Sequence, residues 1–293
     1  MLEKKKDWHA YLYLAIPLIL LTIFTFYPII KTLWVSFLPD YLPLTDNVSF
    51  NFGISNYTIL FNNPNFEQVM INTFLLVIVS VPLSVVLALI IAIALNSIKP
   101  LKSFFQTVYF LPYVTNTIAI GMVFSVIFNG NIGLLRAFGL EGNWIDGNAS
   151  YFSKMMVLQL YVLWSSLAFK ILIFLGGLQN IGKNYYDAAA VDGTSKFRVT
   201  MRITIPLLSP TILFISMTSF IGAFKSYDAI IGLFGENFQE TRQMQTVVGL
   251  IYDYIGRGGL FYGRGAALAV ILLGIILVFT LVQQFLAKKF VHY

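Results

Sequence analysis

Chemical groups that proteins often use for catalysis and metal binding are missing or rare in this sequence. None of the 293 residues is cysteine, so disulfides, thiolate metal sites and cysteine nucleophiles are excluded. Only two histidines are present, His9 and His292, and they stand near opposite ends, which argues against a metal site. Charge is also scarce, at 11% of residues against about 25% in a soluble domain. The formal net charge of +6 does not indicate nucleic-acid binding, because the cations are scattered at the ends of apolar runs.

Apolar residues are correspondingly abundant. They make up 58% of the chain, more than a soluble fold can bury, which indicates a bilayer as the natural solvent. A membrane-spanning helix needs about 20 mostly apolar residues. The sequence therefore predicts an all-α membrane protein with six transmembrane helices. The predicted spans are residues 10–30, 69–95, 103–128, 154–178, 206–224 and 264–287, the fifth being the least apolar.

The distribution of cations predicts the orientation of these spans. With six spans, both termini lie on one side of the membrane. Eleven Lys and Arg residues fall on that side and six on the other. Cytoplasmic segments carry the excess of Lys and Arg, so we expect the N- and C-termini in the cytoplasm of a multi-pass membrane protein.

Residues 179–205 form a polar segment between the fourth and fifth spans, on the predicted cytoplasmic side. We predict two short helices here. Asn184 caps the first, Asp187 reaches back to it as in a capping box, and Gly193 ends it, because glycine accepts the left-handed conformation of a C-cap. The second starts at Thr194 or Ser195 and ends at Ile203. The alternative is an ordinary loop whose small residues only turn the chain.

This segment resembles the EAA loop of type I ATP-binding-cassette (ABC) importer permeases. The resemblance is carried by three groups in register: Asp187-Ala188-Ala189, Asp192-Gly193 and Ile203-Thr204-Ile205-Pro206. The chain departs from the pattern where Asp187 replaces a glutamate and Phe197 a tryptophan. Outside the loop the resemblance continues in Asn72-Thr73, in Phe110-Leu111-Pro112-Tyr113, and in Tyr262-Gly263 with Ala266-Ala267-Leu268.

Within this family, the chain resembles the sugar-permease branch. It is similar to the larger maltose-permease subunit, but without the extra domain of that subunit. It implies a MetI-like bundle that forms one transmembrane permease domain over residues 1–293. Its core would be about 69–287, with a coupling loop at 179–205, and residues 1–68 would form the first helix and an outer loop. The implied set of residues that contact the ATPase is Tyr186, Asp187, Ala188, Ala189, Asp192, Gly193, Phe197 and Pro206.

The resemblance also implies partners and a location. In a bacterial cell membrane, the chain would pair with a second, homologous permease subunit. Two copies of a cytoplasmic ABC ATPase would hydrolyse the ATP, so this chain is not itself an enzyme and is expected to need no cofactor or metal. An extracellular solute-binding protein would deliver the solute.

A few polar residues within or beside the spans are candidates for a solute pathway. Lys170 lies deep in the fourth span, where a charge is costly and tends to face a wet cavity or another helix. The other candidates are Trp164, Ser165, Lys225, Tyr227 and Asp228. The plainer interpretations are snorkelling or a misplaced span boundary for Lys170, packing for Trp164, and interfacial anchoring for Lys225, Tyr227 and Asp228.

The main functional expectation is thus import of a sugar or oligosaccharide. Glycerol phosphate, an amino acid or a peptide remains an alternative solute within the same importer class. An ion-coupled carrier or a channel is the alternative from another class, although we find neither an inverted repeat nor midplane carboxylates.

Overall fold

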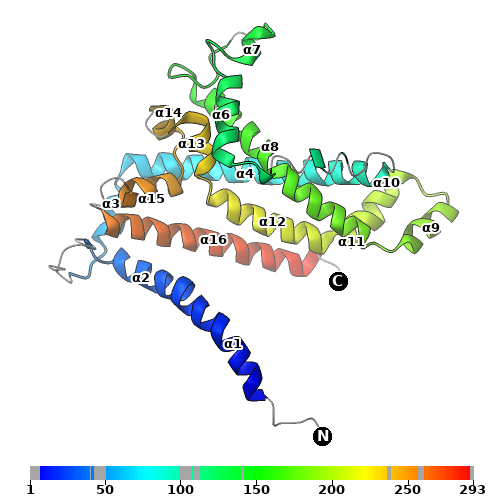
Figure 1. The fold of residues 1–293 in the computed structure, drawn as a ribbon, viewed down its shortest axis with the longest axis horizontal. Coiled ribbons are helices and arrows are strands. Elements are labelled where there is room, and N and C mark those ends of the chain that lie inside the picture. Colours follow the sequence, from blue (N-terminus) through cyan, green and yellow to red (C-terminus); the bar gives the residue numbers. More distant parts are fainter. Residues whose placement is uncertain are drawn as a thin grey trace. The chain divides into compact units, whose positions relative to one another are not determined.

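The structure, a computed structural model, describes residues 7–39, 41–42, 51–98, 104, 107–108, 113–139, 142–235, 239–256 and 261–290. Within these ranges the secondary structure is helical (Figure 1). Internal contacts divide the chain into two compact units. The first comprises Met1–Phe66 and Leu250–Gly274, and the second comprises Glu67–Gly249 and Ile275–Tyr293.

Four of the predicted spans are confirmed as helices long and apolar enough to cross a membrane. The first combines α1 (Asp7–Leu21), the π-helical turn η1 (Thr22–Phe26) and α2 (Tyr27–Ser36), and it extends six residues beyond the predicted end. The second, fourth and sixth are α4 (Pro64–Ser97), α8 (Tyr151–Gln179) and α16 (Tyr262–Phe290). Each of these three matches its prediction within a few residues at either end.

The third predicted span, residues 103–128, is broken rather than continuous. The helix α6 runs only over Thr117–Ile127, and Asn116 before it has extended backbone. The Asn116 side chain accepts hydrogen bonds from the backbone N–H groups of Ile118 and Ala119, as an N-cap does. Much of the expected span before Tyr113 lies outside the described residues.

The fifth predicted span begins later than expected, at Ser209, where α12 (Ser209–Phe224) follows a bend of 67°. Pro210 has no N–H to bond the carbonyl of Pro206, and the Ser209 hydroxyl donates to that carbonyl instead, at 2.7 Å. The helix before the bend also continues past the predicted end at Ile203. It consists of α10 (Lys196–Val199), the π-helical turn η2 (Thr200–Thr204) and α11 (Ile205–Leu207). At the end of the π turn, the N–H of Ile205 donates a hydrogen bond to the carbonyl of Thr200.

Short helices lie in the segments between the spans that are predicted for the outer side. They are α3 (Ser55–Phe61), α7 (Leu134–Ala137), α13 (Asp228–Phe234), α14 (Gln239–Gln243) and α15 (Val247–Gly256). In the second unit, α13 packs against α6 and α8. Gly121 and Gly232 let α6 and α13 approach closely, because a Cβ on Gly121 would lie 2.6 Å from the carbonyl carbon of Gly232.

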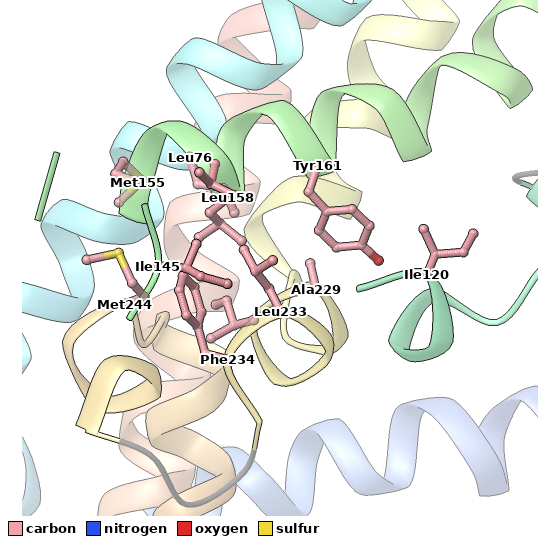
Figure 2. Close-up of a cluster of buried hydrophobic side chains, with 12 residues drawn as sticks. Leu76, Ile120, Ile145, Met155, Leu158, Tyr161, Ala229, Leu233, Phe234 and Met244 are labelled. Atoms are coloured by element: carbon pink, nitrogen blue, oxygen red, sulfur yellow. The ribbon is translucent and has the colours of Figure 1, made fainter. Parts of the chain in front are cut away.

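The buried core of the second unit lies where α8, α6 and α13 meet (Figure 2). Leu158 and Tyr161 project from α8 toward Leu233 of α13 and Ile120 of α6. The Tyr161 hydroxyl donates to the Thr117 carbonyl at 2.5 Å, so the polar tip of this buried ring is satisfied. A separate aromatic cluster joins α4, α12 and the last part of α16, with Phe74, Phe224 and Phe279 in edge-on or tilted contacts at 5.1–6.2 Å.

A polar clamp formed by Asn72, Thr73 and the turn 243–247 holds one end of the second unit. The Asn72 amide donates to the carbonyls of Gln243 and Gln245, and its oxygen accepts from the Tyr151 hydroxyl. Thr73 accepts from the N–H of Val247. The clamp gives the Asn72-Thr73 motif a structural role: it fixes the start of α15 against α4 and α8.

The Tyr262-Gly263 motif at the start of α16 also has a structural role, within the first unit. A Cβ on Gly263 would lie 2.3 Å from the Leu38 carbonyl oxygen and 2.6 Å from the Asn56 amide nitrogen. Asn56 is itself buried and donates to the Ser36 carbonyl. Only glycine permits this approach between the end of α2, α3 and α16.

Candidate functional site

The polar segment between the fourth and fifth spans folds as two short helices, as predicted, and we call this pair the hairpin. It comprises α9 (Lys183–Val191) followed by α10, and it lies beyond the end of α8 that is opposite to α13 and α14 (Figure 1). The predicted cap is wrong, because Gly182 is the N-cap and Asn184 lies inside the helix. Asp187 accordingly does not reach back in a capping box and instead pairs with Lys183 at 4.0 Å, with both side chains exposed.

Gly193 ends α9 as predicted. Its φ is +63°, which is the left-handed region. The N–H of Thr194 bonds the carbonyl of Ala189 at 3.0 Å, and the N–H of Gly193 bonds that of Ala190 at 3.1 Å. These two bonds form a Schellman motif, whose C′ position favours glycine. Ser195 then precedes α10 as its N-cap, with extended backbone.

Internal contacts hold the hairpin together and present part of the predicted ATPase-contact set outward. Tyr186 and Thr204 share a hydroxyl–hydroxyl bond of 3.3 Å, and Ala189 is buried. Ala188, Asp192 and Gly193 are exposed, whereas Pro206 is half-buried in α11. Phe197 is 73% exposed, which leaves a large apolar ring at the tip of the hairpin.

Sequence reasoning missed Val191, which is 89% exposed on the last turn of α9. The sequence did contain a signal for this exposure: Val191 is an apolar β-branched residue directly before Asp192-Gly193. The glycine that ends the helix fixes where the last turn of α9 points. A groove of about 540 Å³ lies between α9 and the helix that follows. Ala188, Asp192, Arg198 and Arg202 are among the residues that line it.

A cavity of about 430 Å³ lies within the second unit, lined by residues of α4, α6, α8, α12 and α13. It brings together five of the six residues predicted for a solute pathway: Ser165, Lys170, Lys225, Tyr227 and Asp228. The sixth, Trp164, packs its ring against Phe124 at 5.5 Å. Nine lining residues bear hydroxyl groups: Ser80, Tyr113, Thr117, Ser165, Ser166, Thr218, Ser219, Ser226 and Tyr227.

Lys170 is the most deeply placed charge in this cavity. Its side chain is 5% exposed, and its ammonium donates to Ser84 at 2.5 Å and to Ser166 at 3.0 Å. In the part of the chain that the structure describes, the ion pair between Lys183 and Asp187 is the only one within 4.0 Å, so Lys170 has no carboxylate partner there.

The cavity wall also carries an aromatic pair that sequence reasoning did not identify. Tyr113 and Phe169 stack with ring centroids 5.5 Å apart and an interplanar angle of 21°. Aromatics are too common in this chain, with 27 Phe and 16 Tyr, for either residue to stand out in the sequence. Ser166, which follows Ser165 in the fourth span, lies four residues before Lys170 on the same helix face.

Comparisons with known proteins place the chain among transport components. A family model described as "Binding-protein-dependent transport system inner membrane component" matches residues 80–292. The arabinooligosaccharides transport system permease protein AraP of Bacillus subtilis is 33% identical, with 96% of this chain and 88% of AraP covered. The lactose transport system permease protein LacF of Rhizobium radiobacter is 28% identical, with 98% and 97% covered.

A solved structure shows the same fold. A chain of a bacterial alginate ABC transporter, in complex with an alginate pentasaccharide-bound periplasmic protein, superposes with a TM-score of 0.83. The match covers 97% of this chain and 96% of the other, at 18% identity.

Proposed function

Because the chain belongs to the family of binding-protein-dependent transport system inner membrane components, we propose that it forms one side of the path that takes an oligosaccharide across the membrane. The chain is a multi-pass membrane permease with a MetI-like fold, and ATP hydrolysis resides in a separate subunit of such systems. Arabinooligosaccharides and lactose, named for AraP and LacF, support a sugar as the solute class.

The observation that carries the proposal is the hydroxyl-rich cavity with its stacked aromatic wall. Sugars present apolar ring faces and many hydroxyl groups, so a site for them combines aromatic surface with a few oriented polar groups. Tyr113 and Phe169 supply the aromatic surface, and the nine hydroxyl-bearing residues supply oxygen atoms that can accept hydrogen bonds from sugar hydroxyl groups. Ser165, Tyr227 and Asp228 would orient the solute. Trp164 would act nearby through its contact with Phe124.

The hairpin α9–α10 would couple this path to the ATPase. A docking element must be rigid to transmit motion, and the Schellman turn at Gly193 with the Tyr186–Thr204 bond provides that stiffness. Ala188, Asp192 and Gly193 are exposed and would touch the ATPase, with Phe197 as an apolar anchor. Asp187 would exchange its weak pairing with Lys183 for a contact on the partner. Pro206 would lie at the bend between the hairpin and the span, where its carbonyl accepts from the Ser209 hydroxyl.

The assembly that follows from this proposal has four kinds of component. A second, homologous permease completes the path, two ATPase copies dock on the coupling hairpins, and an extracellular solute-binding protein delivers the oligosaccharide. The chain acts as one permease domain with both termini in the cytoplasm. Closure of the ATPase dimer on ATP would move the hairpins and expose the cavity alternately to the two sides.

The test is reconstitution of the complete complex in proteoliposomes. Oligosaccharide-loaded binding protein should stimulate ATP hydrolysis and solute uptake together, and the chain reconstituted alone should transport nothing. The panel includes glycerol phosphate, an amino acid and a peptide, each with a binding protein specific for it. Stimulation by one of these and not by sugar would replace the proposed solute. Transport by the chain alone without ATP would establish a carrier or channel instead.

A further inference from the structure

The cavity holds a buried positive charge that a neutral sugar does not require. Counted from the ends of α8, Lys170 lies about 28 Å from Tyr151 and about 14 Å from Gln179, at 1.5 Å per residue. A hydrocarbon core is about 30 Å thick, so the ammonium is too deep to reach an interface easily. Charges at such depth are costly and mark solute or ion pathways.

The surroundings of Lys170 fix the ammonium without neutralising it. The Ser84 hydroxyl donates to the Val81 carbonyl at 2.9 Å, and the Ser166 hydroxyl donates to the Leu163 carbonyl at 3.0 Å. Each hydroxyl has thereby used its proton, so only its lone pairs can face the ammonium. Two of the three N–H groups of Lys170 are held in this way, and one is left for the cavity.

The other charges that line the cavity do not cancel this one. Lys225 adds a second cation, and Asp228 is the single carboxylate among the described lining residues. Neither Lys170 nor Lys225 lies within 4.0 Å of a described carboxylate. Serine and threonine hydroxyls, which the cavity has in plenty, would suffice to bind sugar hydroxyl groups.

We propose that Lys170 forms an anion subsite in the cavity, which binds a carboxylate or phosphate oxygen carried by the oligosaccharide. The inference rests on the proposed function, since it assumes that the cavity is on the solute path. It narrows the solute class to acidic oligosaccharides. A charge-assisted hydrogen bond from the remaining N–H would hold the anionic oxygen while the surrounding hydroxyls bind the sugar.

The test measures direct binding to the purified complex of both permeases and the ATPase, without binding protein. The probes are a neutral tetrasaccharide, the same tetrasaccharide with carboxylates at C6, and one with a single C6 phosphate. We expect the wild-type complex to bind an acidic form more tightly than the neutral form. The relative affinities of carboxylate and phosphate identify the preferred anion. Equal or tighter binding of the neutral form overturns the inference without any variant.

Substitutions then assign the effect to Lys170. Lys170→Met should weaken binding of the acidic form by about tenfold to a hundredfold and leave the neutral form unchanged, whereas Lys170→Arg should preserve the preference. Lys170→Gln keeps hydrogen bonding to the serines without charge, so it tests the same point if the methionine variant is unstable. The matched control is Lys154→Met, which removes a lysine that is 2% exposed on the same helix and bonds Gln243 outside the cavity.

Different results would refute the anion subsite and the sugar path. If the neutral and acidic forms bind alike and Lys170→Gln changes neither, the anion subsite is wrong while the sugar path stands. If no tetrasaccharide binds and an amino acid or peptide does, both are wrong. If Lys154→Met abolishes the preference as strongly as Lys170→Gln, the effect is not local to the cavity, and the inference is also overturned.

Discussion

Replacement of Gly193 by valine should uncouple the ATPase while leaving the membrane part intact. The left-handed backbone at φ +63° costs an L-residue about 1–2 kcal/mol, and a β-branched side chain more. The two bonds of the Schellman motif contribute about 0.5–1.5 kcal/mol each. The strain is therefore as large as the interactions that close the turn. The end of α9 should open in a large fraction of molecules and misplace Asp192.

The assay is co-purification of the ATPase with the permease, alongside the amount of permease in the membrane. Gly139 provides a control matched in strain, because it has φ +79° and, like Gly193, no heavy atom within 4 Å of where a Cβ would lie. Gly139→Val should leave ATPase binding unchanged, and Gly193→Asn should retain most of it, since asparagine tolerates this conformation. If the Gly193→Val permease co-purifies with as much ATPase as the wild type, the turn at Gly193 is not needed for docking.

Three further predictions concern the ATPase interface, the polar clamp and the packing of α6 against α13. Val191→Ser should lower the affinity for the ATPase about tenfold, because burying the exposed Val191 side chain in the docked state is worth about 1.5 kcal/mol. An unchanged affinity in a titration would show that Val191 is not in the interface. Asn72→Ala should lower the free energy of unfolding in detergent by about 1–3 kcal/mol, because the buried Asn72 amide donates to the carbonyls of Gln243 and Gln245 and both bonds are lost. Gly121→Ala should lower the free energy of unfolding by about 1–3 kcal/mol, because the added methyl group would clash with Gly232. Gly176→Ala is the control, since its Cβ would meet open space. Equal effects of the two variants on the melting temperature would contradict the close approach of α6 and α13.

The long helices could be predicted from the sequence because the bilayer sets their length. Apolar runs near 20 residues locate α4, α8 and α16 within a few residues. The turn at Gly193 could also be predicted from the sequence, since few residues other than glycine accept a positive φ. Both signals are local. They depend on a run of neighbouring residues or on one backbone angle, and not on which helices pack together.

The breaks within spans could not be predicted in the same way. Apolar composition continues through Asn116, and only its bonds to Ile118 and Ala119 reveal a new helix start. The bend before α12 comes from Ser209 taking over the carbonyl that Pro210 leaves unbonded. The error at Asn184 has a similar origin, because Gly182 supplies the extended backbone of the cap two residues earlier.

The cavity was predictable in part. Lone polar residues in apolar spans pointed to Ser165 and Lys170, and residues beside the span ends pointed to Lys225, Tyr227 and Asp228. The partners of Lys170 depend on packing between α4 and α8, so Ser84 could not be identified from the sequence. The same holds for the pair formed by Tyr113 and Phe169, which follow from tertiary contacts and not from their spacing.

Cysteine labelling at Ala190 tests the central claim, that the α9–α10 hairpin docks on the ATPase in the cytoplasm. The chain has no cysteine, so Ala190→Cys introduces one reactive thiol on an exposed position of α9. If the hairpin docks there, this thiol should crosslink to the ATPase and should not react with a membrane-impermeant maleimide added to intact cells. Labelling from outside the cell, without a crosslink to the ATPase, would contradict it.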